Sequence, residues 1–334
     1  MAKSIQFLTT TQSLLLIAFY VVAGCGLNNS PLKDKVVCID PGHGGTAMTD
    51  SFRIGLTGER EEWINLRVAL ELKTLLESKN CKVILTRIAD ESVALQKRAI
   101  IAVKNKADVF ISIHHNATAD SSVNFPIVYF HGNSSENQAS VQLGKSILKY
   151  ISKLVYRDST EISLVSDYTI YPNSGTAVLR HSYGIPGIIG EASFFTHPAE
   201  EIRLKSKSYN KQEAQAYYKA LEEYFSMAPQ PIVKKFSIVQ IPAFPVLQEK
   251  DRMDPVALLW QDDYNQAVSL FYQDDNISLQ KSLDLFTRSV RSFPDSWLAG
   301  SAHIYRAKIL RKLRKETEAI IEEKRISEYY VNLD

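Results

Sequence analysis

The chain has 334 residues, of which 45% are apolar and 23% are charged, and its formal net charge is +2. This length is too great for one small domain and suits two, with ample apolar material for a core. Because Lys and Arg are spread along the chain and form no basic cluster, the composition argues against a nucleic-acid-binding protein.

The amino terminus is typical of an exported lipoprotein. Only Lys3 is charged before an apolar run of about a dozen residues, which is too short to span a bilayer and has the length of a signal-peptide core. The run ends in VAGC, which resembles the bacterial lipobox, so we expect a signal peptide over 1–24, lipidation of Cys25 and a polar tether over 25–34. The alternative is a plain signal peptide with an incidental cysteine. Both interpretations predict export to the cell envelope, and the first adds a membrane anchor that does not span the bilayer.

Residues 35–226 alternate between short, β-branched apolar segments and amphipathic stretches. This alternation predicts an α/β domain with a largely parallel, twisted sheet flanked by helices. The predicted strands are 35–40, 82–87, 108–116, 126–132 and 185–191, and the predicted helices are 60–79, about 93–106, about 136–155 and about 210–226.

Two further segments follow. Four prolines between 227 and 253 argue against a regular element, so this segment is a predicted linker. Apolar residues then recur every three or four positions over 254–334, which predicts a small all-α region with one helix start at Pro294. The rhythm resembles a tetratricopeptide-type pair of helical hairpins that binds a protein partner. A helical cap packed on the α/β domain is an equally good interpretation, because solenoids usually need three or more repeats.

The remaining cysteines, Cys38 and Cys81, lie in or beside strand-like apolar segments, and we expect two buried thiols. An exported protein can pair its cysteines, but two of them define no disulfide framework. The sequence has no closely spaced cysteine pair of the zinc-binding kind. A metal would therefore be held by His and carboxylate side chains.

Three predicted strands end in residues that can bind metal or move protons. His43 follows the first strand in IDPGHGG, His114 and His115 end the third, and Glu191 ends the last. Glycine permits tight turns and lets another atom come close, which suits a ligand site around His43. Sites in open α/β sheets form beyond the carboxyl ends of strands, so we expect these groups to meet at one edge. Because neighbours on a strand point to opposite faces, His114 and His115 cannot both face a metal easily.

The predicted helix 60–79 supplies a further carboxylate. At about 100° per residue, its buried stripe centres on Ile64, Val68, Leu72, Leu75 and Leu76. Glu61 falls near the middle of the stripe, Glu62 at its border and Glu59 roughly opposite. A carboxylate on the buried face is unfavourable unless it is paired or metal-bound, so Glu61 is the predicted ligand. We expect Glu59 and Glu62 at the surface near the helix amino end.

A typical catalytic zinc site has three protein ligands and a fourth position open to water. Two neutral histidines and one carboxylate, here His43, His114 and Glu61, are such a set of ligands. Zinc lowers the pKa of such a water toward about 7 and polarises a carbonyl group. Glu191, outside the ligand set, is the predicted group that takes the proton of the water and passes it to a leaving amine. This chemistry fits amide hydrolysis.

The same residues resemble the bacterial zinc-dependent N-acetylmuramoyl-L-alanine amidases over about residues 35–226. VVCIDPGHGG is similar to the opening strand and loop of that family, and EEWINLRVAL places Glu61 on its metal-binding glutamate. SIHHN corresponds to the SIHAN motif and places a histidine ligand on His114, while EASFFTHP places the catalytic carboxylate on Glu191. The resemblance implies peptidoglycan as substrate and hydrolysis of the amide between N-acetylmuramic acid and L-alanine.

The sequence departs from the family at His115, where a small residue is usual, and at His197, where Asn is usual. We expect His115 at the rim of the site or behind the ligands. Arg87, Arg98 and Arg180 have two interpretations, contact with an acidic stem peptide or structural ion pairs, of which the second is the more common role. Two other functions stay open, a catalytically inactive lipid-anchored peptidoglycan-binding scaffold and a zinc peptidase acting on other amides.

Overall fold

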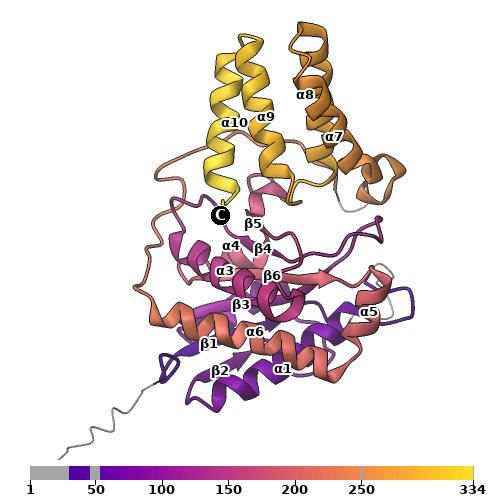
Figure 1. Cartoon of the computed structure of the whole chain (residues 1–334). Coiled ribbons are helices and arrows are strands. Elements are labelled where there is room, and N and C mark those ends of the chain that lie inside the picture. Colours follow the sequence, from indigo (N-terminus) through magenta and orange to yellow (C-terminus); the bar gives the residue numbers. More distant parts are fainter. Residues whose placement is uncertain (1–29, 46–52, 249–250, 334) are drawn as a thin grey trace, which may run out of the picture.

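The computed structural model describes residues 30–45, 53–248 and 251–333, which are built around a six-stranded sheet (Figure 1). The predicted signal peptide and Cys25 lie outside the described residues. The strands are β1 (Val36–Pro41), β2 (Lys82–Leu85), β3 (Val109–Asn116), β4 (Ile127–Phe130), β5 (Ser163–Ser166) and β6 (Gly187–Phe194), in the spatial order β2-β1-β3-β6-β4-β5. The predicted α/β fold with a largely parallel sheet is confirmed.

Strand direction divides the sheet into two parts. The strands β2, β1, β3 and β6 are parallel, whereas β4 is antiparallel to β6 and parallel to β5. The segment 117–126 is too short for the crossover that a parallel strand needs, so β4 runs back along the sheet. The carboxyl ends of β1, β3 and β6 therefore lie at one edge, and those of β4 and β5 lie at the opposite edge. The strand β5 was not predicted, because it is short and only Leu164 and Val165 in it are apolar.

Helices cover both faces of the sheet. The helices α1 (Glu61–Glu77), α3 (Gln138–Ile151) and α6 (Lys207–Ser226) pack together on one face, which is toward the viewer in Figure 1. On the other face α2 (Leu95–Lys104) contacts the short α4 (Ala177–His181). The helix α5 (Pro198–Leu204) comes directly before α6 in the chain and contacts it. Four residues of the predicted stripe of α1 are buried in the core, namely Ile64, Val68, Leu72 and Leu76. Burial of each side chain stabilises the fold by roughly 1.5–3 kcal/mol.

Within the described residues, the predicted all-α region contains four α-helices, and they stand above the sheet in Figure 1. They are α7 (Trp260–Phe271), α8 (Asn276–Ser292), α9 (Ala299–Lys312) and α10 (Glu316–Tyr329), and successive helices pack against each other. The predicted helix start at Pro294 is wrong, because α9 begins at Ala299. The carboxylate of Asp295 accepts a hydrogen bond from the Tyr129 hydroxyl of β4, so it serves the contact between the two parts of the chain.

The predicted linker is held against the sheet-containing part, and we call its residues 228–248 the strap. The backbone N–H of Val233 donates to the Glu136 carbonyl (2.8 Å), and that of Ile238 donates to the Glu136 carboxylate (3.1 Å). The Val239 carbonyl accepts a hydrogen bond from Asn133 (2.8 Å). Although its prolines prevent a regular helix or strand, the strap is anchored at several points.

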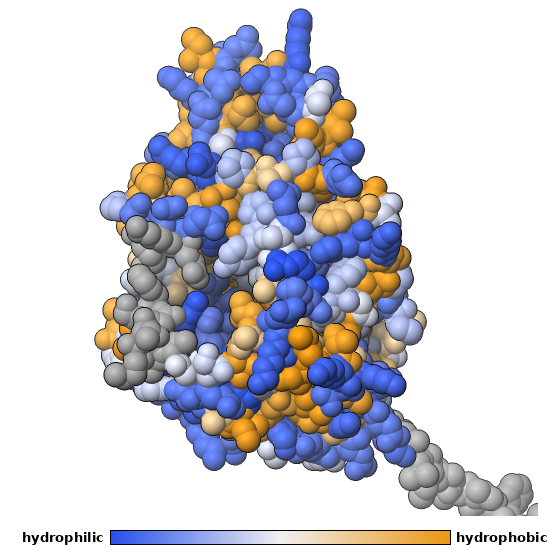
Figure 2. Space-filling view, turned by 180° about the vertical axis from the view of Figure 1, so that it is seen from behind, coloured by the Kyte–Doolittle hydropathy of each residue, from blue (hydrophilic) through white to orange (hydrophobic). Residues whose placement is uncertain are grey.

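Seen from behind, the narrower helical region rises above the broader sheet-containing part, and polar and apolar side chains are interspersed on both (Figure 2). Among the described residues, no helix combines the length and apolar character needed to cross a membrane. Cys38 and Cys81 are buried free thiols, as expected, and burial raises the pKa of Cys38 to about 12 and that of Cys81 to about 11.

Candidate metal centre

The first predicted ligand, His43, lies in the loop directly after β1, with its backbone in the left-handed region (φ 57°). Two buried arginines hold this loop. Arg98 donates to the carbonyls of Pro41 (2.8 Å) and His43 (2.6 Å). Arg87 donates to the carbonyls of Pro41 (2.8 Å) and Gly42 (2.9 Å). Both arginines therefore have a structural role. The predicted structural ion pair is present for Arg98, which pairs with Asp40 (2.8 Å), whereas Arg87 acts through backbone carbonyls.

The second predicted ligand, His114, lies near the end of β3 and directly against the loop. A Cβ atom on Gly42 would approach the His114 imidazole to 2.2 Å, so only glycine leaves room for this ring. The rings of His43 and His114 meet edge to face, with centroids 4.6 Å apart. The glycine thus permits the close approach expected from the IDPGHGG motif.

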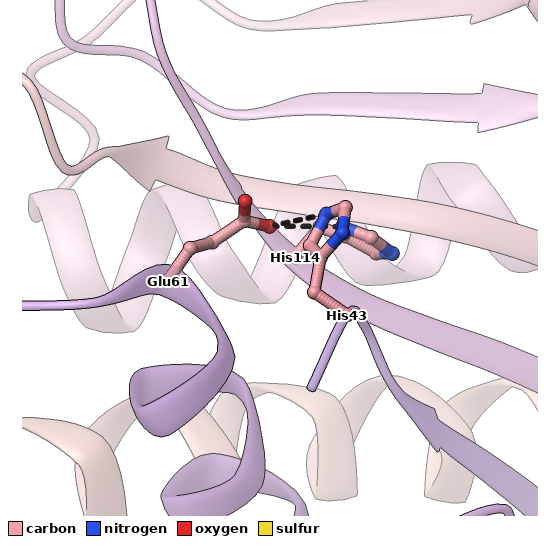
Figure 3. A group of neighbouring side chains, drawn as sticks. All are labelled: His43, Glu61 and His114. Atoms are coloured by element: carbon pink, nitrogen blue, oxygen red, sulfur yellow. Dashed lines mark hydrogen bonds and ion pairs between the residues drawn. The ribbon is translucent and has the colours of Figure 1, made fainter. Parts of the chain in front are cut away.

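Glu61, the first residue of α1, completes the group (Figure 3). Its Oε1 lies 3.2 Å from Nε2 of His43 and 2.9 Å from Nδ1 of His114. Each of the three residues offers a ligand atom, and these atoms all lie within 4.8 Å of one another. A loop, a helix and a strand therefore bring the three predicted ligands together.

Burial and charge put two of these groups in the protonation states that metal binding requires. Burial lowers the pKa of His114 to about 4, so its imidazole is neutral near neutral pH and keeps a lone pair. Burial alone would raise the pKa of Glu61, but the charge of His43 and hydrogen bonds with His114 and His43 hold it well below its usual range. Glu61 is therefore a carboxylate.

A buried chain of hydrogen bonds runs behind the ligands from α1 to α6. Asn65 donates through Nδ2 to Glu61 Oε1 (3.2 Å), and its Oδ1 lies 2.8 Å from His115 Nδ1. His115 Nε2 lies 3.0 Å from the Glu213 carboxylate. Burial alone would lower the pKa of His115, but Glu213 raises it above its usual value. His115 therefore lies behind the ligands, where such contacts fix ligand orientation.

Asn65 and Glu213 were not predicted as parts of this chain of contacts. Asn65 follows Glu61 by one helical turn, so the buried stripe of α1 carried a signal for it. Glu213 lies on α6, far away in the sequence, and no local pattern links it to His115.

The predicted surface positions of Glu59 and Glu62 are wrong, because both are buried. Glu62 accepts a hydrogen bond from Arg60 (2.6 Å), and Glu59 accepts one from Arg67 (2.7 Å). The loop before α1 is covered by α5, whose Glu201 accepts a hydrogen bond from the backbone N–H of Glu59 (3.1 Å). Helix phase could not reveal this cover, and each buried carboxylate has the arginine partner that its burial requires.

Glu191, the predicted proton-transfer group, is paired with His114 in the ladder between β6 and β3. Paired positions on neighbouring strands project to the same face of a sheet, so the Glu191 side chain lies beside His114. A few residues on, Nδ1 of His197 accepts a hydrogen bond from the backbone N–H of Glu200 (3.2 Å) at the start of α5. This is the capping role that Asn commonly fills, which accounts for the departure at His197.

The donor set fits zinc. Two imidazole nitrogens and a carboxylate oxygen are the ligands of many catalytic zinc sites, where each lies about 2.0–2.2 Å from the ion. Separations of 3.2 Å and 2.9 Å between ligand atoms are close to those around such a tetrahedral ion. The side chains of His43 and His114 are 22% and 15% exposed, so the site is open to solvent.

Comparison with known proteins places this geometry in a family. The family model described as N-acetylmuramoyl-L-alanine amidase matches residues 37–223. Probable cell wall amidase LytH of Staphylococcus epidermidis is 30% identical over 206 residues, which is 62% of this chain and 64% of LytH. N-acetylmuramoyl-L-alanine amidase AmiC of Escherichia coli is 28% identical over 224 residues, which is 57% of this chain and 53% of AmiC. The match spans less than two thirds of either relative.

Among solved structures, N-acetylmuramoyl-L-alanine amidase AmiC2 of Nostoc punctiforme is 29% identical with a TM-score of 0.50, and the match covers 58% of this chain and 98% of that chain. The family match includes the sheet from the second residue of β1 onward, the three ligand candidates and Glu191, and it ends before the strap. The chain therefore belongs to the N-acetylmuramoyl-L-alanine amidase family.

Proposed function

We propose that this chain is a zinc-dependent N-acetylmuramoyl-L-alanine amidase, which hydrolyses the amide between N-acetylmuramic acid and L-alanine in peptidoglycan. One observation carries the proposal. The ligand atoms of His43, Glu61 and His114 converge next to the strand position of Glu191, inside the segment that matches the family. The activity for which AmiC of Escherichia coli is named supports the choice of substrate.

In this proposal His43, Glu61 and His114 hold the zinc ion, and the buried Asn65 keeps the Glu61 carboxylate in place. When bound, zinc would supply an activated water and polarise the scissile carbonyl. Glu191 takes the proton of the attacking water and delivers it to the amine that leaves. The neutral state of the His114 imidazole and the charged state of Glu61 suit their roles as ligands.

The test separates binding of metal from catalysis. Glu191→Ala is expected to keep its zinc, measured by elemental analysis, and to lower stem-peptide release from purified sacculi by about 100-fold or more, because positioned acid–base groups supply such factors. His43→Ala is expected to lose zinc and activity together. Glu161→Ala, at an exposed position, is the matched control. Release at the wild-type rate by Glu191→Ala would rule out the proposed role of this residue.

Product analysis distinguishes the other functions. A scaffold would bind sacculi stoichiometrically and would release no stem peptide, with or without metal. A peptidase would free amino groups inside the stem peptide, whereas the proposed amidase frees the amino group of L-alanine and leaves the lactyl carboxylate on the sugar. Mass spectrometry of the digest identifies which bond has been cut.

We also propose that the protein acts in the cell envelope as a lipoprotein anchored through Cys25. The apolar run and the VAGC motif support the anchor, and the name of LytH as a cell wall amidase supports the location. Cys25→Ser is expected to move the protein from the membrane to the soluble fraction of exported proteins. Membrane attachment that survives this change would contradict lipid anchoring.

A further inference from the structure

A pocket of about 270 Å³ lies where the strap passes between the sheet and the helical region. Its walls come from four separate segments, the ends of β4 and β5, the strap, and α10. The carboxyl ends of β4 and β5 lie at the edge of the sheet opposite the metal centre. The strap and α10 also lie outside the family match, so the pocket is a feature of this chain beyond the family fold.

The side chains that line the pocket are neutral, although the Lys235 ammonium lies 5.5 Å from the centroid of the Phe236 ring. The lining includes three aromatic residues and three amides, which are Tyr168, Phe236, Tyr329, Asn133, Asn173 and Gln240. The rings of Tyr168 and Phe236 are nearly parallel, with an angle of 9° and centroids 6.5 Å apart, and Tyr329 meets Tyr168 edge-on. Within the described part of the chain, no charged side chain lines the pocket. Aromatic surfaces with a few polar groups are the usual lining of sites for small, uncharged ligands.

Two features of the pocket are unfavourable without a ligand. Tyr168 is 4% exposed, and among the described residues its hydroxyl has no hydrogen-bond partner. Buried polar groups in native proteins are nearly always paired, so this hydroxyl needs an explanation. Phe236 is 48% exposed and has φ 61°, a conformation that is rare for a bulky residue. Strained residues of this kind cluster at ligand sites.

A buried chain of contacts fixes the backbone next to both rings. Nδ1 of His131 lies 2.8 Å from Asp167, the neighbour of Tyr168, and Nε2 of His131 lies 3.0 Å from Nζ of Lys235, the neighbour of Phe236. An ammonium group only donates, so Nε2 accepts from Lys235 and Nδ1–H donates to Asp167. The two aromatic walls are therefore held in place before any ligand arrives, which favours binding.

We propose that this pocket binds a pyranose ring of the glycan strand of peptidoglycan, at a site separate from the metal centre. One face of an N-acetylated sugar carries C–H groups that pack on the exposed Phe236 ring, and its hydroxyl and acetamido groups pair with the amides and with the Tyr168 hydroxyl. The neutral lining disfavours an acidic stem peptide. The choice of glycan rests on the proposed function, whereas the preference for a neutral ring rests on the pocket itself.

The test uses the linear tetramer of N-acetylglucosamine as probe and the full mature chain freed of metal by a chelator. Isothermal titration calorimetry is expected to give saturable binding. Phe236→Ala and Tyr168→Phe should each weaken binding by roughly three- to ten-fold, since one removes a stacking surface and the other a hydrogen bond. The matched controls bind like wild type. They are Tyr272→Ala, an exposed aromatic residue of the helical region, and Tyr218→Phe, which loses a hydroxyl on α6.

Two results would overturn the proposal. The first is the absence of saturable binding at millimolar tetramer. The second is unchanged affinity in Tyr168→Phe together with a higher melting temperature, which would make the lone hydroxyl a packing defect. His43→Ala is expected to bind the tetramer like wild type. Because binding is measured without hydrolysis, a chain that binds glycan but releases no stem peptide would refute the proposed activity and leave this site standing.

Discussion

At the scale of single residues, glycine decides whether the proposed metal centre can form. The loop after β1 must bring its own His43 and the imidazole of His114 to the same point, and that imidazole occupies the space that a Cβ atom on Gly42 would need. His43 itself has a left-handed backbone, and Gly44 and Gly45 continue the turn with φ 114° and 69°. Any side chain at Gly42 would occupy the space of a ligand, so the motif reflects a limit on space as well as on backbone conformation.

Gly42→Ala is expected to leave the fold intact and to weaken zinc binding by about 100-fold or more, because the added Cβ displaces the His114 ring. A chelator competition titration measures the affinity, and circular dichroism checks the fold. Gly187→Ala in β6 is the matched control, since its Cβ would meet its nearest neighbour at an ordinary 3.5 Å. Wild-type zinc affinity in Gly42→Ala would show that His114 is not held by this contact.

At the scale of elements, buried charge joins α9 to α10. Glu322 of α10 is paired with His303, and its carboxylate also lies 3.3 Å from Arg306 of α9. Arg325 donates to the Pro242 carbonyl (3.0 Å), which ties the same hairpin to the strap. Although burial alone would raise the pKa of Glu322, His303 and the two arginines hold it well below its usual range. The hairpin therefore depends on an ionised Glu322.

Glu322→Ala is expected to lower the free energy of unfolding by roughly 3 kcal/mol, because it leaves buried arginine without its partner. Glu323→Ala removes a neighbouring carboxylate that pairs with Arg311 at the surface, and it should have little effect. Urea unfolding measures both variants. Equal stability of the two variants would show that the buried pairing contributes nothing beyond a surface ion pair.

The same contact predicts a dependence on pH. Because the pKa of Glu322 is lower in the folded chain than in the unfolded chain, its carboxylate stabilises the fold at pH values above its ordinary pKa of 4.5. That contribution to stability is lost progressively as the pH falls below 4.5. The difference in unfolding free energy between wild type and Glu322→Ala should therefore narrow below about pH 4.5. A difference that stays constant down to strongly acidic pH would contradict this origin.

At the scale of the whole molecule, aromatic packing joins the helical region to the sheet. We call Phe125, Phe194, Trp260, Phe293 and Trp297 the aromatic seam. The Trp297 ring lies 4.6 Å from Phe125 and 5.0 Å from Trp260, measured between centroids, and Phe125 stacks on Phe194 at 5.3 Å. Phe125 and Phe194 belong to the sheet part, whereas the other three belong to the helical region. Since both parts bury their apolar surface in one seam, we expect them to unfold together.

Tryptophan fluorescence can test this coupling. The chain has three tryptophans, so a Trp63→Phe variant keeps Trp260 and Trp297 of the seam as its only tryptophans. Urea unfolding followed by fluorescence and by far-ultraviolet circular dichroism is expected to give the same midpoint. Phe125→Ala in this background should lower the free energy of unfolding by roughly 3–5 kcal/mol. Both urea midpoints should therefore move to lower urea together. A fluorescence change at lower urea than the circular dichroism change would mean that the helical region detaches first.

Much of the site was predictable because its signals are local. Positions at or just after the predicted strand ends gave His43 and His114, and helix phase distinguished Glu61 from its neighbours. The structure brings these three side chains together, and the role of Glu191, chosen in the same way, stays a prediction. The same reasoning failed for Glu59 and Glu62, since the cover over the first turn of α1 comes from α5, far along the chain. It also could not assign the Glu213 contact of His115, because residues that meet only through packing leave no spacing to detect.

The sequence by itself determined the α/β class, the alternation of the longer strands and helices, the buried face of α1 and the three candidate metal ligands, because each depends on a short period or a local motif. Only the tertiary structure decided that β4 runs back along the sheet, that the strap and α10 enclose a pocket, and that the helical region shares an aromatic seam with the sheet. These features arise from burial of surfaces distant in the chain. Many pairings of such surfaces satisfy the same local pattern, and packing selects one of them.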